Sequence, residues 1–438
     1  MERYKQQFGV VIFNSKLFTM FKRLLLSTTG LLLTSLCFSQ ERPAAPAVSV
    51  SIYGFIRNDM NYDSRQNVFV REGQLDLYPK DKDIQSDGKD YNKKSQLNIL
   101  GILSRLGVKI SGPDAFKAKT SAVIEGDFFG QADVNIGLFR LRHGFVKLDW
   151  KKSALTVGQT WYPLFIPECF PGTVNFNTGI PIAPFGWAGQ IKYTAKFTDK
   201  VNLSVTAYKP REFAVANVNS ADNANAASMN ATLPELNLHL QYKADKILFG
   251  AQADYSVLRP NVKYGTAPNF LISDETVSGF TAMAYAKFAG KKIAVKTQLV
   301  LGQNTTHWVM MGGYYGYRKS AASIETYKPA KTTAAWVDIY GTGKKIVPGL
   351  FIGYSVNNGA KDSATAAYGR AIGVGGRGVK DLLRISPRLD FISGKLAFRN
   401  ELEFTQAKYG TRSSDGKVRG ATDKITNVRF TFSTVYNF

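Results

Sequence analysis

Apolar and polar side chains alternate along most of the chain after residue 50, in segments of about 8 to 16 residues. Neighbouring side chains of a β-strand point to opposite faces, so a period of two predicts strands with one apolar and one polar face. No apolar run after residue 40 approaches the roughly 18 residues that a membrane-spanning helix requires. The pattern predicts sixteen strands, at 50–60, 95–110, 117–130, 138–150, 153–162, 188–198, 201–208, 233–242, 246–256, 275–288, 291–302, 331–342, 345–356, 379–391, 394–407 and 424–438.

Two kinds of connection alternate between these strands. Short connections such as 151–153 and 198–200 are built from turn-forming residues, whereas every second connection is longer and reaches about thirty residues in 63–93 and 303–330. An even number of strands with this rhythm predicts an all-β, transmembrane, antiparallel β-barrel of about sixteen strands, with short periplasmic turns and long extracellular loops. The barrel must close, because an open edge would leave backbone groups unpaired in lipid.

The two faces are most distinct on the last predicted strand, 424–438. Phe430 and Phe432 share one face, and Asn427 and Arg429 share the other. A soluble β-sandwich would point the apolar face inward, whereas a membrane barrel points it at lipid, so alternation alone permits both structures.

The N-terminal region favours export. From Met20, a basic pair (Lys22 and Arg23) precedes an apolar stretch and a small-residue cleavage site at Cys37-x-Ser39, which is the organisation of a signal peptide. We therefore expect a signal peptide at 1–39, whose true start is Met20 or Met1, a short periplasmic linker at 40–49, and a single barrel at 50–438.

The end of the chain also favours the membrane barrel. The chain ends in Phe438, with further aromatic residues two, six and eight positions earlier. This tail resembles the C-terminal strand by which outer-membrane proteins are recognised by the barrel-assembly machinery. Together with the signal peptide and the turn rhythm, it predicts a place in the cell outer membrane of a Gram-negative bacterium, in contact with lipid and lipopolysaccharide.

Composition narrows the possible chemistry. Two cysteines cannot form a disulfide framework, and three scattered histidines, His143, His239 and His307, give no zinc-binding spacing, so we expect neither metal nor cofactor. The formal net charge is +23, and residues 1–39 hold five basic and one acidic side chain, so the remainder keeps about +19. In a barrel this excess indicates small anions as partners, and not nucleic acid.

Charged residues on the predicted lumenal face form the candidate site. Acidic residues of strand 117–130 face basic residues of strand 138–150, and the arrangement predicts either a charged constriction that selects anions or a lattice of ion pairs that stiffens the wall. The candidate constriction residues are Arg105, Lys109, Lys119, Glu125, Asp127, Arg140 and Arg142. A second basic ladder on the same face comprises Arg384, Arg388, Arg399 and Arg429.

Strand 138–150 contains a break in its alternation. Arg140 and Arg142 are expected to point inward, whereas Val146 and Leu148 have the parity of outward residues. We therefore predict an irregularity, such as a bulge, near Gly144. His143 is expected on the opposite, lipid side, packed in the wall, with a pH-sensitive lumenal group beside Arg142 as the alternative.

The loop 163–187 differs from the others in composition. It holds five of the sixteen prolines and is rich in aromatic residues, although an exposed loop should be polar. We expect it to fold into the lumen or along a subunit interface, with a compact surface loop as the alternative.

Five short motifs resemble those of the DcaP-like trimeric porins of Gram-negative outer membranes, in the order of that family: SRLG at 104–107, AVIEGDFFG at 122–130, FRLRHG at 139–144, LTVGQTW at 155–161 and PGTVNF at 171–176. The resemblance covers about residues 95 to 200 and continues more weakly to the end of the chain. It implies a homotrimer of sixteen-stranded barrels that pass small anionic solutes, often dicarboxylates. This sequence has Asn175 where that family commonly has an acidic residue, and 41–49 replaces the coiled coil of some members.

The expected function is that of an outer-membrane porin for passive diffusion of small hydrophilic anions. A structural or adhesive surface barrel without significant transport is the alternative, and an outer-membrane hydrolase is a more remote one, because no serine motif accompanies the three histidines. The run GVGGRG at 373–378 formally matches a dinucleotide-binding fingerprint. We interpret it as a loop, since no strand–helix context surrounds it.

Overall fold

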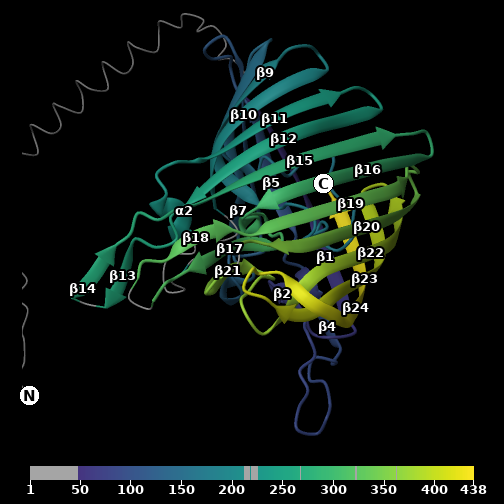
Figure 1. Cartoon of the computed structure of the whole chain (residues 1–438). Coiled ribbons are helices and arrows are strands. Elements are labelled where there is room, and N and C mark those ends of the chain that lie inside the picture. Colours follow the sequence, from purple (N-terminus) through teal and green to yellow (C-terminus); the bar gives the residue numbers. More distant parts are fainter. Residues whose placement is uncertain (1–47, 212–217, 219–224, 267, 321–322, 362) are drawn as a thin grey trace, which may run out of the picture. The chain divides into compact units, whose positions relative to one another are not determined.

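Sixteen antiparallel strand positions form a closed wall in the computed structural model, which describes residues 48–438 apart from 212–217, 219–224, 267, 321–322 and 362 (Figure 1). The wall strands are β1 (Ser49–Asp63), β5 (Arg105–Ser111), β6 (Lys119–Asp127), β7 (Arg140–Asp149), β8 (Ser153–Trp161), β9 (Trp187–Lys196), β10 (Val201–Pro210), β11 (Glu235–Lys243), β12 (Ile247–Leu258), β15 (Val277–Ala289), β16 (Ile293–Gln303), β19 (Lys331–Gly341), β20 (Ile346–Gly359), β22 (Arg377–Ser393), β23 (Leu396–Arg412) and β24 (Val418–Asn437).

Closure is achieved by the first and last strands. β1 pairs with β24 from Phe55 opposite Asn437 to Asp63 opposite Arg429, and its other edge pairs with β5 and with the short strand β4 (Gln96–Leu100). β4 and β5 together occupy the predicted strand 95–110, which is interrupted at 101–104. Each predicted strand corresponds to one wall position, so the predicted fold class is confirmed.

The wall has an apolar outside and a polar inside. On β24 the side chain of Phe430 is exposed, whereas Arg429 and Thr431 are almost fully buried. The same alternation runs along β22, where Ile385 is exposed and Arg384 is buried. An exposed apolar face and a covered polar face are the reverse of a soluble sandwich and fit a wall that faces lipid.

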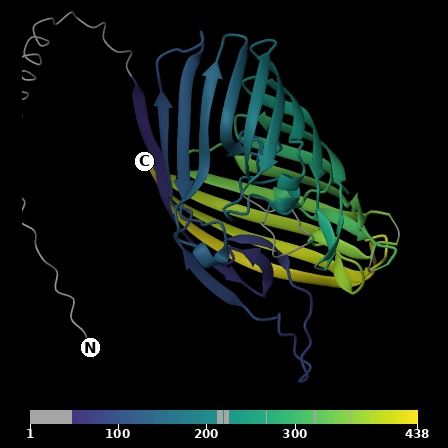
Figure 2. The same ribbon diagram turned by 90° about the vertical axis from the view of Figure 1, so that its left-hand side faces the viewer.

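The long loops carry additional short elements, which the sequence analysis did not predict. A view at right angles shows loop segments within the curve of the wall strands (Figure 2). The additional elements are β2 (Asn67–Val70), β3 (Leu75–Pro79), η1 (Asp133–Asn135), α2 (Ala226–Asn230), β13 (Lys263–Thr266), β14 (Asn269–Ile272), η2 (Thr306–Trp308), β17 (Gly312–Tyr317), β18 (Thr326–Pro329) and β21 (Ala366–Arg370). In the part of the chain that the structure describes, no helix is long and apolar enough to cross a membrane.

The described residues from Val48 to Phe438 belong to one compact unit. The predicted signal peptide, 1–39, and almost all of the predicted linker, 40–49, lie outside the described residues. Both assignments therefore remain predictions.

Candidate functional site

The loop between β8 and β9, residues 162–186, folds into the lumen. Nearly all of its residues are buried, and its backbone is held by side chains of distant strands. The amide N–H of Gly172 donates a hydrogen bond to Asp338 of β19 at 2.9 Å, and that of Val174 donates to Glu401 of β23 at 2.6 Å. Further contacts come from β1, β12 and β22. The loop therefore narrows the interior of the barrel from several sides.

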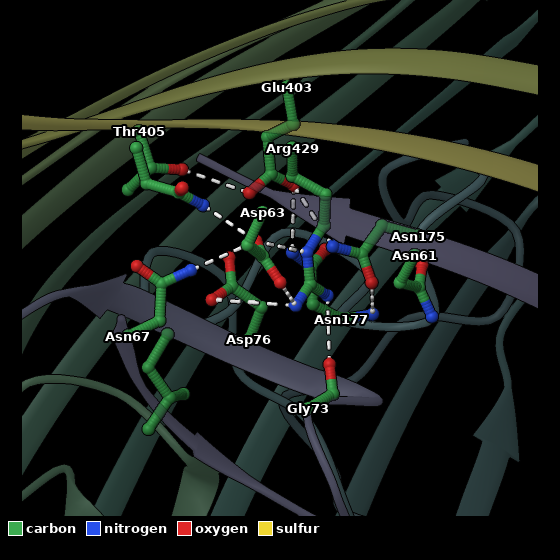
Figure 3. A network of polar contacts seen from close by, with 12 residues as sticks. Asn61, Asp63, Asn67, Gly73, Asp76, Asn175, Asn177, Glu403, Thr405 and Arg429 are labelled. Carbon is green, nitrogen blue, oxygen red and sulfur yellow. Dashed lines mark hydrogen bonds and ion pairs between the residues drawn. The ribbon is translucent and has the colours of Figure 1, made fainter. Parts of the chain in front are cut away.

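A second inward segment is the hairpin formed by β2 and β3. Arg429 of β24 donates to both carboxylate oxygens of Asp63, at 2.8 and 2.7 Å, and to the carbonyl oxygen of Gly73 at 2.8 Å. Figure 3 shows this network, in which Asn175 and Asn177 of the inward loop approach Glu403 next to Arg429. The network ties both loops to the same part of the wall.

The predicted acidic and basic residues of β6 and β7 meet in one cluster. Arg140 donates to Asp127 at 2.7 Å, and Arg142 donates to Glu125 at 2.8 Å and to Asp127 at 3.0 Å. Arg105 on β5 adds a longer ion pair of 3.5 Å to Glu125. Because these side chains are largely buried, their charges act on one another with little screening by water.

The predicted irregularity in this strand is present at Arg142. The pairing of β6 with β7 shifts between Glu125, which faces His143, and Gly126, which faces Leu141, so Arg142 is the extra residue of a bulge. As a result Arg142 and His143 are both buried on the inner side. The expectation that His143 packs on the lipid side is wrong, because the bulge places it inward.

Aromatic rings of the inward loop and its two flanking strands cover the arginines. The guanidinium group of Arg142 lies 4.4 Å from the ring centre of Trp187 and 5.2 Å from that of Trp161. Trp161 stacks on Phe165 with 4.2 Å between ring centres. Contacts of this kind stabilise a guanidinium group without neutralising it.

Beside this cluster lies a cavity of about 300 Å³ whose charged lining residues are all arginines, each paired with a carboxylate outside the lining. Its aromatic wall contains Trp161 and rings of the inward loop, and its lining includes no carboxylate. Among the described residues, Nε of Arg105 and Nη2 of Arg142 are buried without a hydrogen-bond partner. The charged side chains that line the cavity are Arg57, Arg105, Arg142 and Arg399. We refer to this cavity as the arginine pocket.

Two of the predicted constriction residues lie apart from the cluster. Lys109 lies 4.7 Å from the ring centre of Tyr53, and Lys119 is exposed at a position opposite Asp149. Both lie further along their strands, towards the turn 112–118 that joins β5 to β6.

The second predicted ladder lies on the inner face, but each of its arginines has a carboxylate partner. The pairs are Arg384 with Asp76 and Glu403, Arg388 with Asp338, Arg399 with Asp390, and Arg429 with Asp63. Arg384 and Arg429 are almost fully buried and also hold loop carbonyl groups. In this structure the ladder fixes the loops to the wall, and only Arg399 borders the arginine pocket.

Sequence reasoning missed several residues of the site. Arg57 on β1 pairs with Asp59 at 2.8 Å and donates to the carbonyl oxygen of Val174 at 2.6 Å. The alternation along β1 places Arg57 on the inner face, so the sequence could have identified it as a lumenal residue. The roles of Glu401 and Asp338 as acceptors for the loop backbone had no such signal, because the contacts join segments far apart in the chain.

Comparisons with known proteins support the fold. The outer membrane channel DcaP of Acinetobacter baumannii is similar with a TM-score of 0.62 at 16% identity, covering 90% of this chain and 98% of that one. An anion-selective porin from Comamonas acidovorans has a TM-score of 0.54 at 11% identity, covering 90% and 100%. OmpT of Vibrio cholerae has a TM-score of 0.52 at 11% identity, covering 90% and 98%.

No family model and no curated protein matches the sequence. At these identities the structural likeness establishes the fold alone. The resemblance to the DcaP-like porins that the sequence motifs indicated is therefore confirmed as a likeness of fold.

Proposed function

We propose that this protein is a porin of the outer membrane through which small hydrophilic anions, dicarboxylates among them, diffuse passively. The observation that carries the proposal is the arginine pocket, which offers four guanidinium groups and no carboxylate. A solute that passes the inward loop meets the positive field of these side chains. We assign Arg105 and Arg142 the main part in selecting anions, since their guanidinium groups retain unused donors.

The surroundings of the barrel form part of the same proposal. The exposed apolar face of the wall suits outer-membrane lipid and lipopolysaccharide. Export through the signal peptide and insertion by the barrel-assembly machinery, through the strand that ends at Phe438, would bring the chain there. Catalysis forms no part of the proposal.

The test is the reversal potential of the purified protein in a planar bilayer under a potassium chloride gradient. We expect the sign of an anion-selective channel. Arg142→Gln should lower the chloride-to-potassium permeability ratio by roughly fivefold, which corresponds to about 1 kcal/mol. Lys151→Gln, in the exposed turn between β7 and β8, removes the same charge far from the pocket and should leave the ratio unchanged. Cation selectivity of the wild type would refute the proposal.

One observation favours the structural or adhesive alternative. Two inward segments, 162–186 and the hairpin of β2 and β3, fill much of the lumen with buried apolar side chains such as Leu77 and Phe185. The same recording separates the two functions. A folded protein that inserts but conducts no ions would support the structural role and exclude the porin.

We also propose that the protein is a homotrimer, as the resemblance to the DcaP-like porins implies. The chain has a mass of 48.3 kDa, so native mass spectrometry of the detergent-extracted protein should give three times the mass of the processed chain. A monomer under conditions that preserve conductance would contradict the assignment.

A further inference from the structure

The glycine-rich run 373–378 serves to seat an arginine. A Cβ atom on Gly373 would lie 2.7 Å from Cζ of Arg412, and one on Gly378 would collide with Nε of the same side chain. The amide N–H of Arg412 donates to the carbonyl oxygen of Gly376 at 2.9 Å. The glycines therefore let the backbone pack directly on the guanidinium group, which explains the motif without a nucleotide.

A second arginine lies in the same region. Arg370 ends β21, and only Ala371 and Ile372 separate it from the glycine-rich run. Burial raises the pKa of the phenol of Tyr78, on the inward β3, and the guanidinium groups of Arg370 and Arg412 both oppose that rise. Both positive charges therefore lie near this one ring, at the extracellular end of the barrel.

These two arginines differ from those of the wall in having no anionic partner. Among the residues that the structure describes, neither Arg370 nor Arg412 forms an ion pair or a side-chain hydrogen bond, and Nε of each is buried without a partner. Both side chains remain partly exposed. Burying a guanidinium group without a partner costs desolvation free energy. A bound anion offsets this cost because its oxygen atoms accept charge-assisted hydrogen bonds.

The position of the pair indicates which anion. Arg412 lies three residues after Tyr409 on β23. Tyr409 is buried, and its hydroxyl group donates a hydrogen bond of 2.7 Å to the carbonyl oxygen of Pro79 in the inward hairpin. The pairing of β23 with β24 shifts between Tyr409 and Thr411. Beyond this shift Thr411 is exposed, whereas Arg412 is partly covered by the glycine-rich run. The guanidinium group thus sits with the inner elements and is suited to a solute at the channel entrance, not to a lipid headgroup.

We infer that Arg370 and Arg412, with Gly373 and Gly378 packed against the Arg412 side chain, form an extracellular capture site for a small oxyanion such as phosphate or a carboxylate. The inference rests on the proposed channel function and adds a second site, upstream of the arginine pocket. The captured solute is held until it passes the inward loops.

The test uses inorganic phosphate and the whole detergent-solubilised protein. Isothermal titration calorimetry should show saturable binding to the wild type, and the double variant Arg370→Gln with Arg412→Gln should raise the Kd by roughly tenfold or more. Arg377→Gln is the matched control, because Arg377 is exposed and paired with Asp81 and Asp423. Its Kd should equal that of the wild type.

Two further measurements keep the inference open to refutation. Gly373→Ala preserves every charge but displaces the guanidinium group of Arg412, so it should also weaken phosphate binding. In a bilayer, phosphate should reduce the chloride current at lower concentration from the extracellular side than from the periplasmic side.

Three results would overturn the capture site: no saturable binding by the wild type, an unchanged Kd in the double variant, or an equal loss in Arg377→Gln. Its failure is distinguishable from failure of the porin function. Anion selectivity in potassium chloride can persist without phosphate binding, and calorimetry reports binding even if no current flows.

Discussion

At the scale of single residues, the interior of this barrel is built from carboxylates and arginines with divided tasks. Asp338, Glu401 and Glu403 accept hydrogen bonds from the inward loop, and Asp338 and Glu403 also pair with Arg388 and Arg384. Buried carboxylates such as Asp338 and Glu403 are tolerated because a partner of opposite sign lies within contact distance. The field that can act on a solute comes from arginines whose partners are incomplete, such as Arg105 and Arg142.

Asp338 is the residue whose removal should loosen the loop most directly. It accepts from Nη1 of Arg388 at 2.6 Å and from the amide of Gly172 at 2.9 Å. Asp338→Ala leaves Arg388 buried and unpaired, so we expect a loss of about 3–5 kcal/mol in the free energy of unfolding in detergent. We also expect larger and noisier single-channel currents.

The matched control is Asp390→Ala. Asp390 also pairs with an inward arginine, Arg399, but that side chain is 25% exposed and no hydrogen bond joins Asp390 to the loop among the described residues. Its substitution should leave the current noise of the wild type. Equal effects of the two substitutions would mean that Asp338 does not hold the loop.

At the scale of elements, features that depend on local sequence pattern were predictable, whereas features that depend on long-range contacts were not. Each wall strand was predictable because alternation is a local property, and even the bulge at Arg142 left a break in parity. The interruption at 101–104 and the inward hairpin of β2 and β3 left no comparable signal in the sequence pattern. The loop 163–187 was recognisable as unusual, but its direction depends on acceptors such as Glu401, more than two hundred residues later in the chain. Pairing of Arg140 and Arg142 with Glu125 and Asp127 was predictable from neighbouring strands, whereas the arginine pocket was not.

The inward loop should control conductance as an element. Replacing residues 165–183 by a short Gly/Ser linker removes Phe165, Phe170 and Phe176 from the aromatic wall of the arginine pocket. We expect the single-channel conductance to rise several-fold while anion selectivity falls. The control is removal of the hairpin formed by β13 and β14, which projects away from the wall strands (Figure 1) and should leave both quantities unchanged. An unchanged conductance in the linker variant would show that ions follow a path that the loop does not border.

At the scale of the whole molecule, the proposed anion selectivity has two sources, net charge and local charge. The chain carries a formal net charge of +23, of which about +19 lies outside residues 1–39. Many of the wall arginines are paired with nearby carboxylates. Under the proposed function, the excess acts through surface lysines as a diffuse field and through the arginine pocket as a contact field. Only the diffuse part extends far enough to be removed by salt.

Ionic strength should therefore separate the two contributions. The Debye length falls from about 10 Å at 0.1 M to about 3 Å at 1 M, so the diffuse field is screened over this range while groups in contact with a permeating anion are not. We expect the chloride-to-potassium permeability ratio to decline as potassium chloride rises from 0.1 to 1 M and to level off above unity. In Arg142→Gln the same decline should continue towards unity, because the contact field is weakened. A wild-type ratio that reaches unity at 1 M would assign selectivity to surface charge, and one that does not change with salt would assign it wholly to the pocket.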